Sequence, residues 1–146
     1  MRTGASRPSD PSLERLFRLL ADRTRLRLLN LMDGREICVC YLVEVLRISQ
    51  PKISRHLAFL RRAGLVSVRR EGKWIHYRIA EAKNPAVARL LEQLKPLFAE
   101  DSDMRRDKER LGEARCAPRK FIHLRGAPVP TLVRNSGRSG RRANAK

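Results

Sequence analysis

Residues 37–79 constrain the fold of this chain most strongly, because the spacing of their apolar residues changes from that of helices to that of strands. Residues 39–46 and 50–63 carry apolar side chains three and four positions apart, as on one face of a helix. Ser49 is a helix cap with Pro51 in the first turn after it, and Gly64 ends the second segment. Helix, short turn and helix in this order predict a helix-turn-helix.

The next segment, residues 65–79, predicts a β-hairpin. Its first half alternates apolar and polar residues, Glu71-Gly72-Lys73 supplies a turn, and its second half is β-branched and aromatic. A hairpin directly after a helix-turn-helix is a wing. The predicted fold class is therefore mainly α with a small β-hairpin (α+β), a winged helix-turn-helix of about five helices and a two-stranded wing.

Further helices are predicted on both sides of this motif. Asp10-Pro11 and Asp22 are plausible caps for helices over residues 11–20 and 22–32. Asn84-Pro85 starts a last helix, which Pro96 should kink or end near Lys95. Its apolar stripe either pairs with the first helix of a second copy or packs on its own domain, and the pattern leaves both open.

Three regions follow from these patterns: a flexible arm over residues 1–10, a DNA-binding and dimerisation domain over 11–100, and a basic, disordered tail over 101–146. Residues 115–146 contain nine Lys and Arg and no acidic residue, half of the net charge of +18. Such a charge predicts a polyanionic partner, nucleic acid first. Every apolar stretch is broken too early for a membrane span, and no secretory signal follows Arg2, so a cytoplasmic protein is expected.

The second helix of the motif is the predicted DNA-reading helix. At 100° per residue, with Ile53 inward, Ser54 and Arg55 point outward and Lys52 lies on the flank, while Gln50 and His56 lie closer to the buried side. Gln can pair with adenine, and Arg or Lys with guanine. The candidate DNA-binding residues are Gln50, Lys52, Ser54, Arg55 and His56 on the helix and Arg69, Arg70 and Lys73 on the wing. The alternative is an ordinary solvated face.

One such helix reaches few base pairs, so we expect a two-fold dimer on a near-palindromic double-stranded operator. With about four phosphates neutralised per protomer, log K should fall with log[salt] at a slope of roughly −7.

Cys38 and Cys40 fall in the predicted first turn of the helix over residues 39–46. With three cysteines in all, the chain is not a secreted disulfide domain, and close thiols indicate metal, metalloid or redox chemistry, or buried apolar filling. Residues two apart on a regular helix point about 200° apart, so one ion cannot bond both sulfurs without unwinding the turn. Such a distortion would reorient the DNA-reading helix.

Four runs resemble the ArsR/SmtB family: Ile-Cys-Val-Cys-Tyr-Leu at 37–42, Ser-Gln-Pro-Lys-Ile-Ser-Arg-His-Leu at 49–57, Ala-Gly-Leu-Val at 63–66 and Gly-Lys-Trp-Ile-His-Tyr-Arg at 72–78. The resemblance covers about residues 13–98 and is closest to the arsenic-responsive members. It implies a dimeric repressor with first and last helices at the interface, without a tightly bound cofactor, that releases its operator on binding trivalent arsenic or antimony.

The chain departs from the family at the ligands. Val43 stands where the arsenic-sensing motif commonly has a third Cys, residues 85–110 lack the His ligands of zinc sensors, and residues 1–34 lack the Cys of cadmium and lead sensors. Cys116 is the remaining thiol and the candidate third ligand, from either protomer; the alternative is a small thiol or solvent. The candidate metal ligands are Cys38, Cys40 and Cys116.

Other functions remain open at this point: a redox- or persulfide-sensing repressor of the same fold, a cadmium, lead or zinc sensor, and a nucleoid protein that binds DNA mainly through its basic tail. A thiol enzyme such as an arsenate reductase is not expected. Its phosphate loop needs Cys-x5-Arg, and Ile122 stands six residues after Cys116. The prediction is a DNA-binding repressor and not an enzyme.

Overall fold

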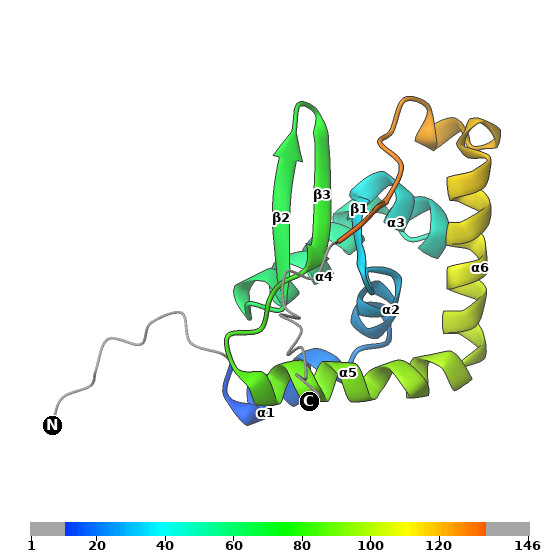
Figure 1. Cartoon of the computed structure of the whole chain (residues 1–146). Coiled ribbons are helices and arrows are strands. Elements are labelled where there is room, and N and C mark those ends of the chain that lie inside the picture. The colour runs from blue at the N-terminus through cyan, green and yellow to red at the C-terminus, as the bar shows by residue number, and fades with distance from the viewer. Residues whose placement is uncertain (1–10, 134–146) are drawn as a thin grey trace, which may run out of the picture.

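The computed structural model describes residues 11–133, which form a mainly helical protein with one small antiparallel sheet (Figure 1). The α-helices are α1 (Leu13–Leu20), α2 (Arg23–Leu31), α3 (Val39–Leu46), α4 (Gln50–Arg62), α5 (Pro85–Glu100) and α6 (Ser102–Cys116). The strands are β1 (Arg35–Cys38), β2 (Val66–Glu71), β3 (Trp74–Ile79) and β4 (Thr131–Leu132), in the sheet order β2-β3-β1-β4. No helix within residues 11–133 is long and apolar enough to cross a membrane.

Local signals start and stop the helices much as the sequence predicts. The Asp22 carboxylate accepts the Arg25 amide at 3.0 Å, and the Asn84 side chain accepts the Ala86 amide at 2.9 Å. Asp10 lies outside the described residues; α1 begins at Leu13 with Ser12 as its cap, so its predicted start at Pro11 was wrong by two residues. Gly64 ends α4 at a φ of +75°, where a residue with a Cβ would be strained.

The predicted winged helix-turn-helix is confirmed. Arg47, at a φ of +55°, turns the chain between α3 and α4, and β2 and β3 pair in a regular hairpin from Val66 opposite Ile79 to Glu71 opposite Trp74. Figure 1 shows this hairpin projecting from the helices. The buried faces of α2, α3 and α4 meet in one core, in which Leu28 and Leu57 are fully buried.

Two strands, β1 and β4, were not predicted from the sequence. β1 pairs with β3, with Ile37 opposite Tyr77 and Cys38 opposite His76, and β4 covers the other edge of β1. Because Cys38 is the last residue of β1 and the N-cap of α3, only Cys40 lies within the first turn of that helix. The placement of both cysteines in that turn was therefore wrong by one residue at Cys38.

Pro96 was predicted to kink or end helix α5, and the end does not occur: α5 runs through Pro96 to Glu100. Proline removes one amide donor from the helix, and the chain tolerates this loss because packing holds the final turn in place: Phe98, two residues later, is buried. The helix therefore lacks one backbone hydrogen bond at Pro96, and tertiary contacts offset this loss.

Residues 102–132, placed by the sequence analysis in a disordered tail, are structured. Asp101 caps α6 by accepting the amides of Asp103 and Met104, and the helix buries Met104 and Leu111 against α2 and α3. Beyond it, two short 3₁₀ turns (Pro118–Lys120 and Ile122–Leu124) bring the chain back to α3 and β1. The expected arm, residues 1–10, and the last basic residues, 134–146, lie outside the described part of the chain.

Buried polar contacts explain why α6 forms. Both oxygens of Asp107, which is 1% exposed, accept 2.7 Å hydrogen bonds from the Arg27 guanidinium on α2. Nearby, the Asn30 amide donates to the Met104 carbonyl at 3.0 Å. These polar residues are visible in the sequence but their pairing is not, because 80 residues separate Arg27 from Asp107 and 74 separate Asn30 from Met104.

Candidate nucleic-acid interface and thiol site

The first turns of α4 present the polar residues expected to contact DNA. Gln50, Lys52 and Arg55 are exposed, and Ser54 is half-buried. His56 is also half-buried, and its Nδ1 lies 3.6 Å from the Asp22 carboxylate, so its ring is turned toward the start of α2. Helix α4 therefore offers three fully exposed polar side chains at its N-terminal end.

The wing residues differ among themselves. Arg70 and Lys73 are exposed, and the Lys73 ammonium lies 4.8 Å from the centre of the Trp74 ring. Arg69, by contrast, donates through Nε to Glu36 on β1 at 2.9 Å and through Nη1 to Glu71 at 3.2 Å. The Arg69 guanidinium lowers the pKa of Glu36. Arg69 thus connects the wing to β1, and two carboxylates already compensate its charge.

The two N-terminal cysteines form a close pair. Cys38 is 1% exposed and Cys40 half-buried, and the Cys40 thiol donates to the Cys38 sulfur across 2.9 Å. This hydrogen bond lowers the pKa of Cys38 to about 7, against the opposing effect of burial, and raises the pKa of Cys40. At about pH 7 roughly half of the Cys38 side chains are therefore thiolates, while Cys40 keeps its proton.

Extended backbone explains why the sulfurs meet. On a regular helix they would point about 200° apart. Cys38, however, has a ψ of 140° as the N-cap of α3, which turns its side chain toward that of Cys40. In this geometry, contrary to the prediction, one ion can therefore approach both sulfurs without unwinding of the turn.

Cys116 does not join this pair in the described chain. It is exposed at the last residue of α6, and no three His, Cys, Asp or Glu side chains within residues 11–133 are grouped so as to hold a metal ion. The structure thus brings Cys38 and Cys40 together and leaves Cys116 apart within one protomer.

Two residues next to the pair escaped the sequence analysis. Tyr41 is fully buried, and its hydroxyl has no hydrogen-bond partner within the described residues. Burial raises its pKa, and so do the neighbouring thiols. His76 lies opposite Cys38 in the sheet, with its Nε2 3.1 Å from Glu71. The proximity of His76 to Cys38 follows from the strand register and is not visible in the sequence.

Comparison with known proteins decides the family. Residues 22–68 match the family model described as bacterial regulatory protein, arsR family. The arsenical resistance operon repressor of Escherichia coli is 47% identical over 79 residues, which cover 53% of this chain and 68% of that repressor. The chain belongs to the ArsR family. Arsenic resistance transcriptional regulator ArsR1 of Pseudomonas putida is 53% identical over 66 residues, 44% of this ArsR-family chain and 51% of the relative.

A solved structure supports the same assignment. The transcriptional repressor BigR from Xylella fastidiosa superimposes with a TM-score of 0.53 at 34% identity, and the match covers 62% of this chain and 88% of that one. These matches confirm the predicted family, the winged helix fold and a DNA-binding transcriptional repressor rather than an enzyme. The ArsR-family chain spans about two thirds of the Escherichia coli repressor and about half of the Pseudomonas putida regulator.

Proposed function

We propose that this ArsR-family repressor binds its operator as a homodimer in the cytoplasm and releases it when trivalent arsenic or antimony bonds to Cys38 and Cys40. The paired sulfurs, 2.9 Å apart at the junction of β1 and α3, carry the proposal. The similarity to one repressor and one transcriptional regulator named for arsenic resistance adds to it. The DNA-binding and dimerisation domain would span residues 11–100, with α6 and the chain after it as an attached cover.

The chemistry suits an arsenous acid. The Cys38 thiolate attacks the arsenic atom and displaces a hydroxide, which leaves as water with a proton from solvent. The Cys40 sulfur forms the second bond as its own proton leaves with a second hydroxide. One remaining hydroxyl completes the site, or a third thiol replaces it with loss of another water. Cys116 of either protomer is the proposed third thiol, and a small thiol is the alternative.

Bonding moves the two sulfurs apart. Trivalent arsenic forms pyramidal bonds with angles somewhat below tetrahedral, so bonds near 2.3 Å set two thiolates roughly 3.4–3.8 Å apart. The observed separation is 2.9 Å, so the end of β1 and the first turn of α3 must shift relative to each other. Cys38 pairs with His76 on the wing strand, and α3 leads directly into α4. The shift is therefore transmitted both to the wing and to the DNA-reading helix.

To act as a switch, the arsenic or antimony ligand must bind the DNA-free repressor more tightly than the DNA-bound repressor. Moving a population from 1:99 to 99:1 requires about 5.5 kcal/mol. Two sites per dimer at roughly 3 kcal/mol each would suffice, at the upper end of usual coupling energies.

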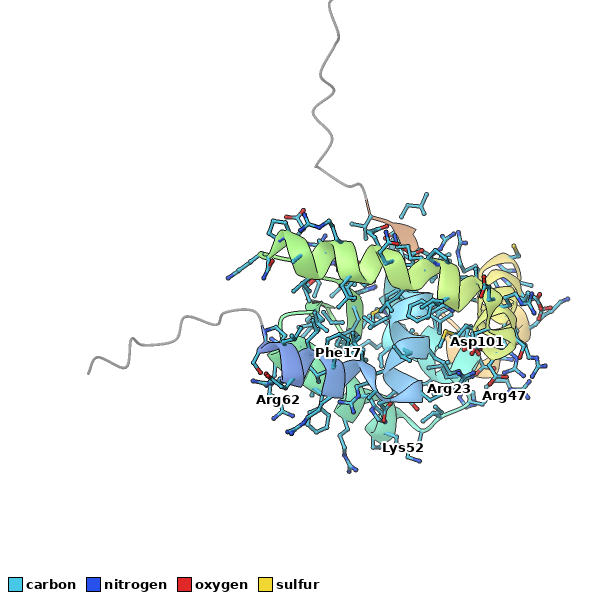
Figure 2. All side chains as sticks on the ribbon, turned by 90° about the horizontal axis from the view of Figure 1, so that it is seen from below. Phe17, Arg23, Arg47, Lys52, Arg62 and Asp101 are labelled. Carbon is cyan, nitrogen blue, oxygen red and sulfur yellow. The ribbon has the colours of Figure 1, made fainter. Side chains whose placement is uncertain are left out.

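Exposed apolar side chains on the first and fifth helices support a dimer. Leu13 and Phe17 on α1 are 65% and 53% exposed, and Leu97 on α5 is 61% exposed. Figure 2 shows Phe17 on α1, at the surface that faces the viewer. Large apolar side chains left in water at two helices favour burial by a second copy. Two copies of α4 would then contact two operator half-sites.

An operator mobility shift tests the proposal. The purified chain is titrated with arsenite, antimonite, cadmium and zinc, as wild type and as Cys38→Ser, Cys40→Ser and Cys116→Ser. We expect wild type to bind and to dissociate with arsenite or antimonite, and the first two variants to bind but not dissociate. A double Cys38→Ser, Cys40→Ser variant that still dissociates with arsenite contradicts the proposal. A normal response of Cys116→Ser excludes that residue as the third ligand.

A second candidate function is redox or persulfide sensing by the same pair. The 2.9 Å sulfur separation and the Cys38 pKa near 7 favour a thiolate that an oxidant can attack. Mass spectrometry after peroxide or polysulfide, beside the arsenite titration, distinguishes the two. Covalent oxidation that releases DNA at reagent levels below those needed for arsenite supports the second function.

A further inference from the structure

A basic groove of about 350 Å³ lies between α4 and the wing strand β3. Its lining comes from one face of α4 and from the middle of β3, and none of it is acidic. The lining residues are Ser54, Ala58, Arg61, Arg62 and Tyr77. Ser54 also belongs to the candidate DNA-binding residues, so the groove continues the expected DNA-reading face toward the C-terminal end of α4.

Positive charge converges on the Tyr77 side of this groove. Arg61 and Arg70 are both exposed, and neither forms an ion pair with any acidic residue in the described range 11–133. Both lie close enough to the Tyr77 hydroxyl to lower its pKa, against the rise that burial causes. Arg69, in contrast, is compensated by Glu36 and Glu71. The groove therefore keeps positive charge that, unlike the charge of Arg69, no carboxylate in the described part of the chain compensates.

Arg62 is held at the mouth of the groove. Its Nε donates to the Ala58 carbonyl at 3.4 Å, and its guanidinium lies 4.8 Å from the centre of the Phe59 ring. Arg25 lies over the same ring at 5.4 Å. Stacking on an aromatic face limits the motion of a long side chain, so less conformational entropy is lost when it binds an anion. Figure 2 shows Arg62 and Lys52 along the same edge of the molecule, on the side away from α5.

We propose that this groove binds one phosphate of the DNA backbone strand that passes between α4 and the wing. Arg61 and the Tyr77 hydroxyl hold the phosphate oxygens, and Arg62 adds charge at the mouth. The proposal rests on the DNA binding proposed above and assigns a contact to residues outside the candidate list. Because phosphate carries no sequence information, the contact fixes the position of the protein on the duplex rather than its choice of bases.

Salt titrations of DNA binding test the groove. We compare wild type with Arg61→Gln, Arg61→Lys and Tyr77→Phe, and use Arg119→Gln, an exposed arginine on the first 3₁₀ turn, as the control of equal charge change. Loss of one phosphate per protomer reduces the slope of log K against log[salt] by about 0.9, or about 1.8 per dimer. We expect this reduction for Arg61→Gln and not for Arg119→Gln or Arg61→Lys.

The Tyr77→Phe variant keeps the charge and removes one hydrogen bond. Its affinity should fall by up to about tenfold with the slope unchanged. Arg61→Gln should weaken binding to operator and to unrelated duplex by the same factor, because the lost contact is with the backbone. An unchanged slope for Arg61→Gln, or a loss confined to the operator, overturns the proposal. Circular dichroism establishes that each variant is folded.

Two further outcomes separate this proposal from its alternatives. When the DNA-free protein is titrated with inorganic phosphate, we expect no saturable binding in the groove. Saturable phosphate binding by wild type that is lost in Arg61→Gln would assign the groove to a free anion instead and overturn the proposal. The proposed function fails separately, if wild type shows no operator preference or no release by arsenite. In that case the slope on unrelated duplex still supports or overturns the phosphate contact.

Discussion

Replacing Asp107 by Asn removes the negative charge that holds α6 on α2. Asp107 is 1% exposed, and its two oxygens accept 2.7 Å hydrogen bonds from Nε and Nη2 of Arg27. Asparagine has a single acceptor oxygen, so one of these bonds is lost and its amide faces a guanidinium. The Asp107 contact raises the pKa of Arg27, which stays charged after the substitution because an arginine does not lose its proton.

The expected loss follows from this burial. Removing one partner of a fully buried ion pair costs about 3–5 kcal/mol. The Arg27 side chain is 20% exposed, and asparagine keeps one acceptor, so we expect about 2–3 kcal/mol for Asp107→Asn. Urea unfolding at one fixed protein concentration measures it, because assembly makes apparent stability depend on concentration.

Asp103→Asn is the matched control on the same helix. Its carboxylate contacts Arg23 at 2.8 Å, but the two side chains are 48% and 52% exposed, and Figure 2 shows Arg23 beside Asp101 at the surface. Exposed pairs contribute at most about 1 kcal/mol. If Asp107→Asn loses no more stability than Asp103→Asn, the buried pair does not hold α6 in place and the reasoning is refuted.

Three further outcomes can be measured. Pro96→Ala restores an amide donor within α5 at an exposed position and should raise the free energy of unfolding by about 1–3 kcal/mol in thermal denaturation. An unchanged free energy of unfolding would show that Pro96 does not destabilise α5. Ultraviolet titration of the thiolate should give half-ionisation of Cys38 at about pH 7, and Cys40→Ala should move it to higher pH, whereas an unmoved midpoint excludes the thiol hydrogen bond as its cause. Glu36 has a lowered pKa in the folded state, so it stabilises the fold at a pH above its unfolded pKa, and this stabilisation disappears as the pH falls through its folded pKa. At neutral pH, Glu36→Gln should lower the free energy of unfolding by under about 1 kcal/mol, and on acidification the variant should lose less stability than wild type.

Local signals made the central motif predictable. Helix caps such as Asp22 and Asn84 and the change in apolar spacing after Gly64 depend only on neighbouring residues, and the structure follows them. Strand β1 has four residues and β4 has two, too few for a pattern, and each depends on partners far along the chain. The sequence therefore predicted the wing without the rest of its sheet.

The candidate site shows the same division. Residue types and spacing identified Cys38 and Cys40 as a pair, but helical geometry placed their sulfurs on opposite sides, and only the extended backbone at Cys38 brings them together. Likewise, the charge of Arg69 is visible in the sequence, whereas its engagement by Glu36 follows from the sheet. Helix α6 was not predicted because its buried face, at positions 104, 107, 111 and 114, includes the charged Asp107 and only two large apolar side chains.

The pairing of β4 with β1 also bears on how the protein is made. Arg35 and Glu36 emerge from the ribosome early, whereas Thr131 and Leu132, which cover that side of the strand, are added almost a hundred residues later, as the register shows. During this interval one edge of β1 in the nascent chain is unpaired, and unpaired edge strands can pair with strands of other chains. Slow translation between residues 37 and 131 thus prolongs the stage at which newly made copies are most prone to aggregate.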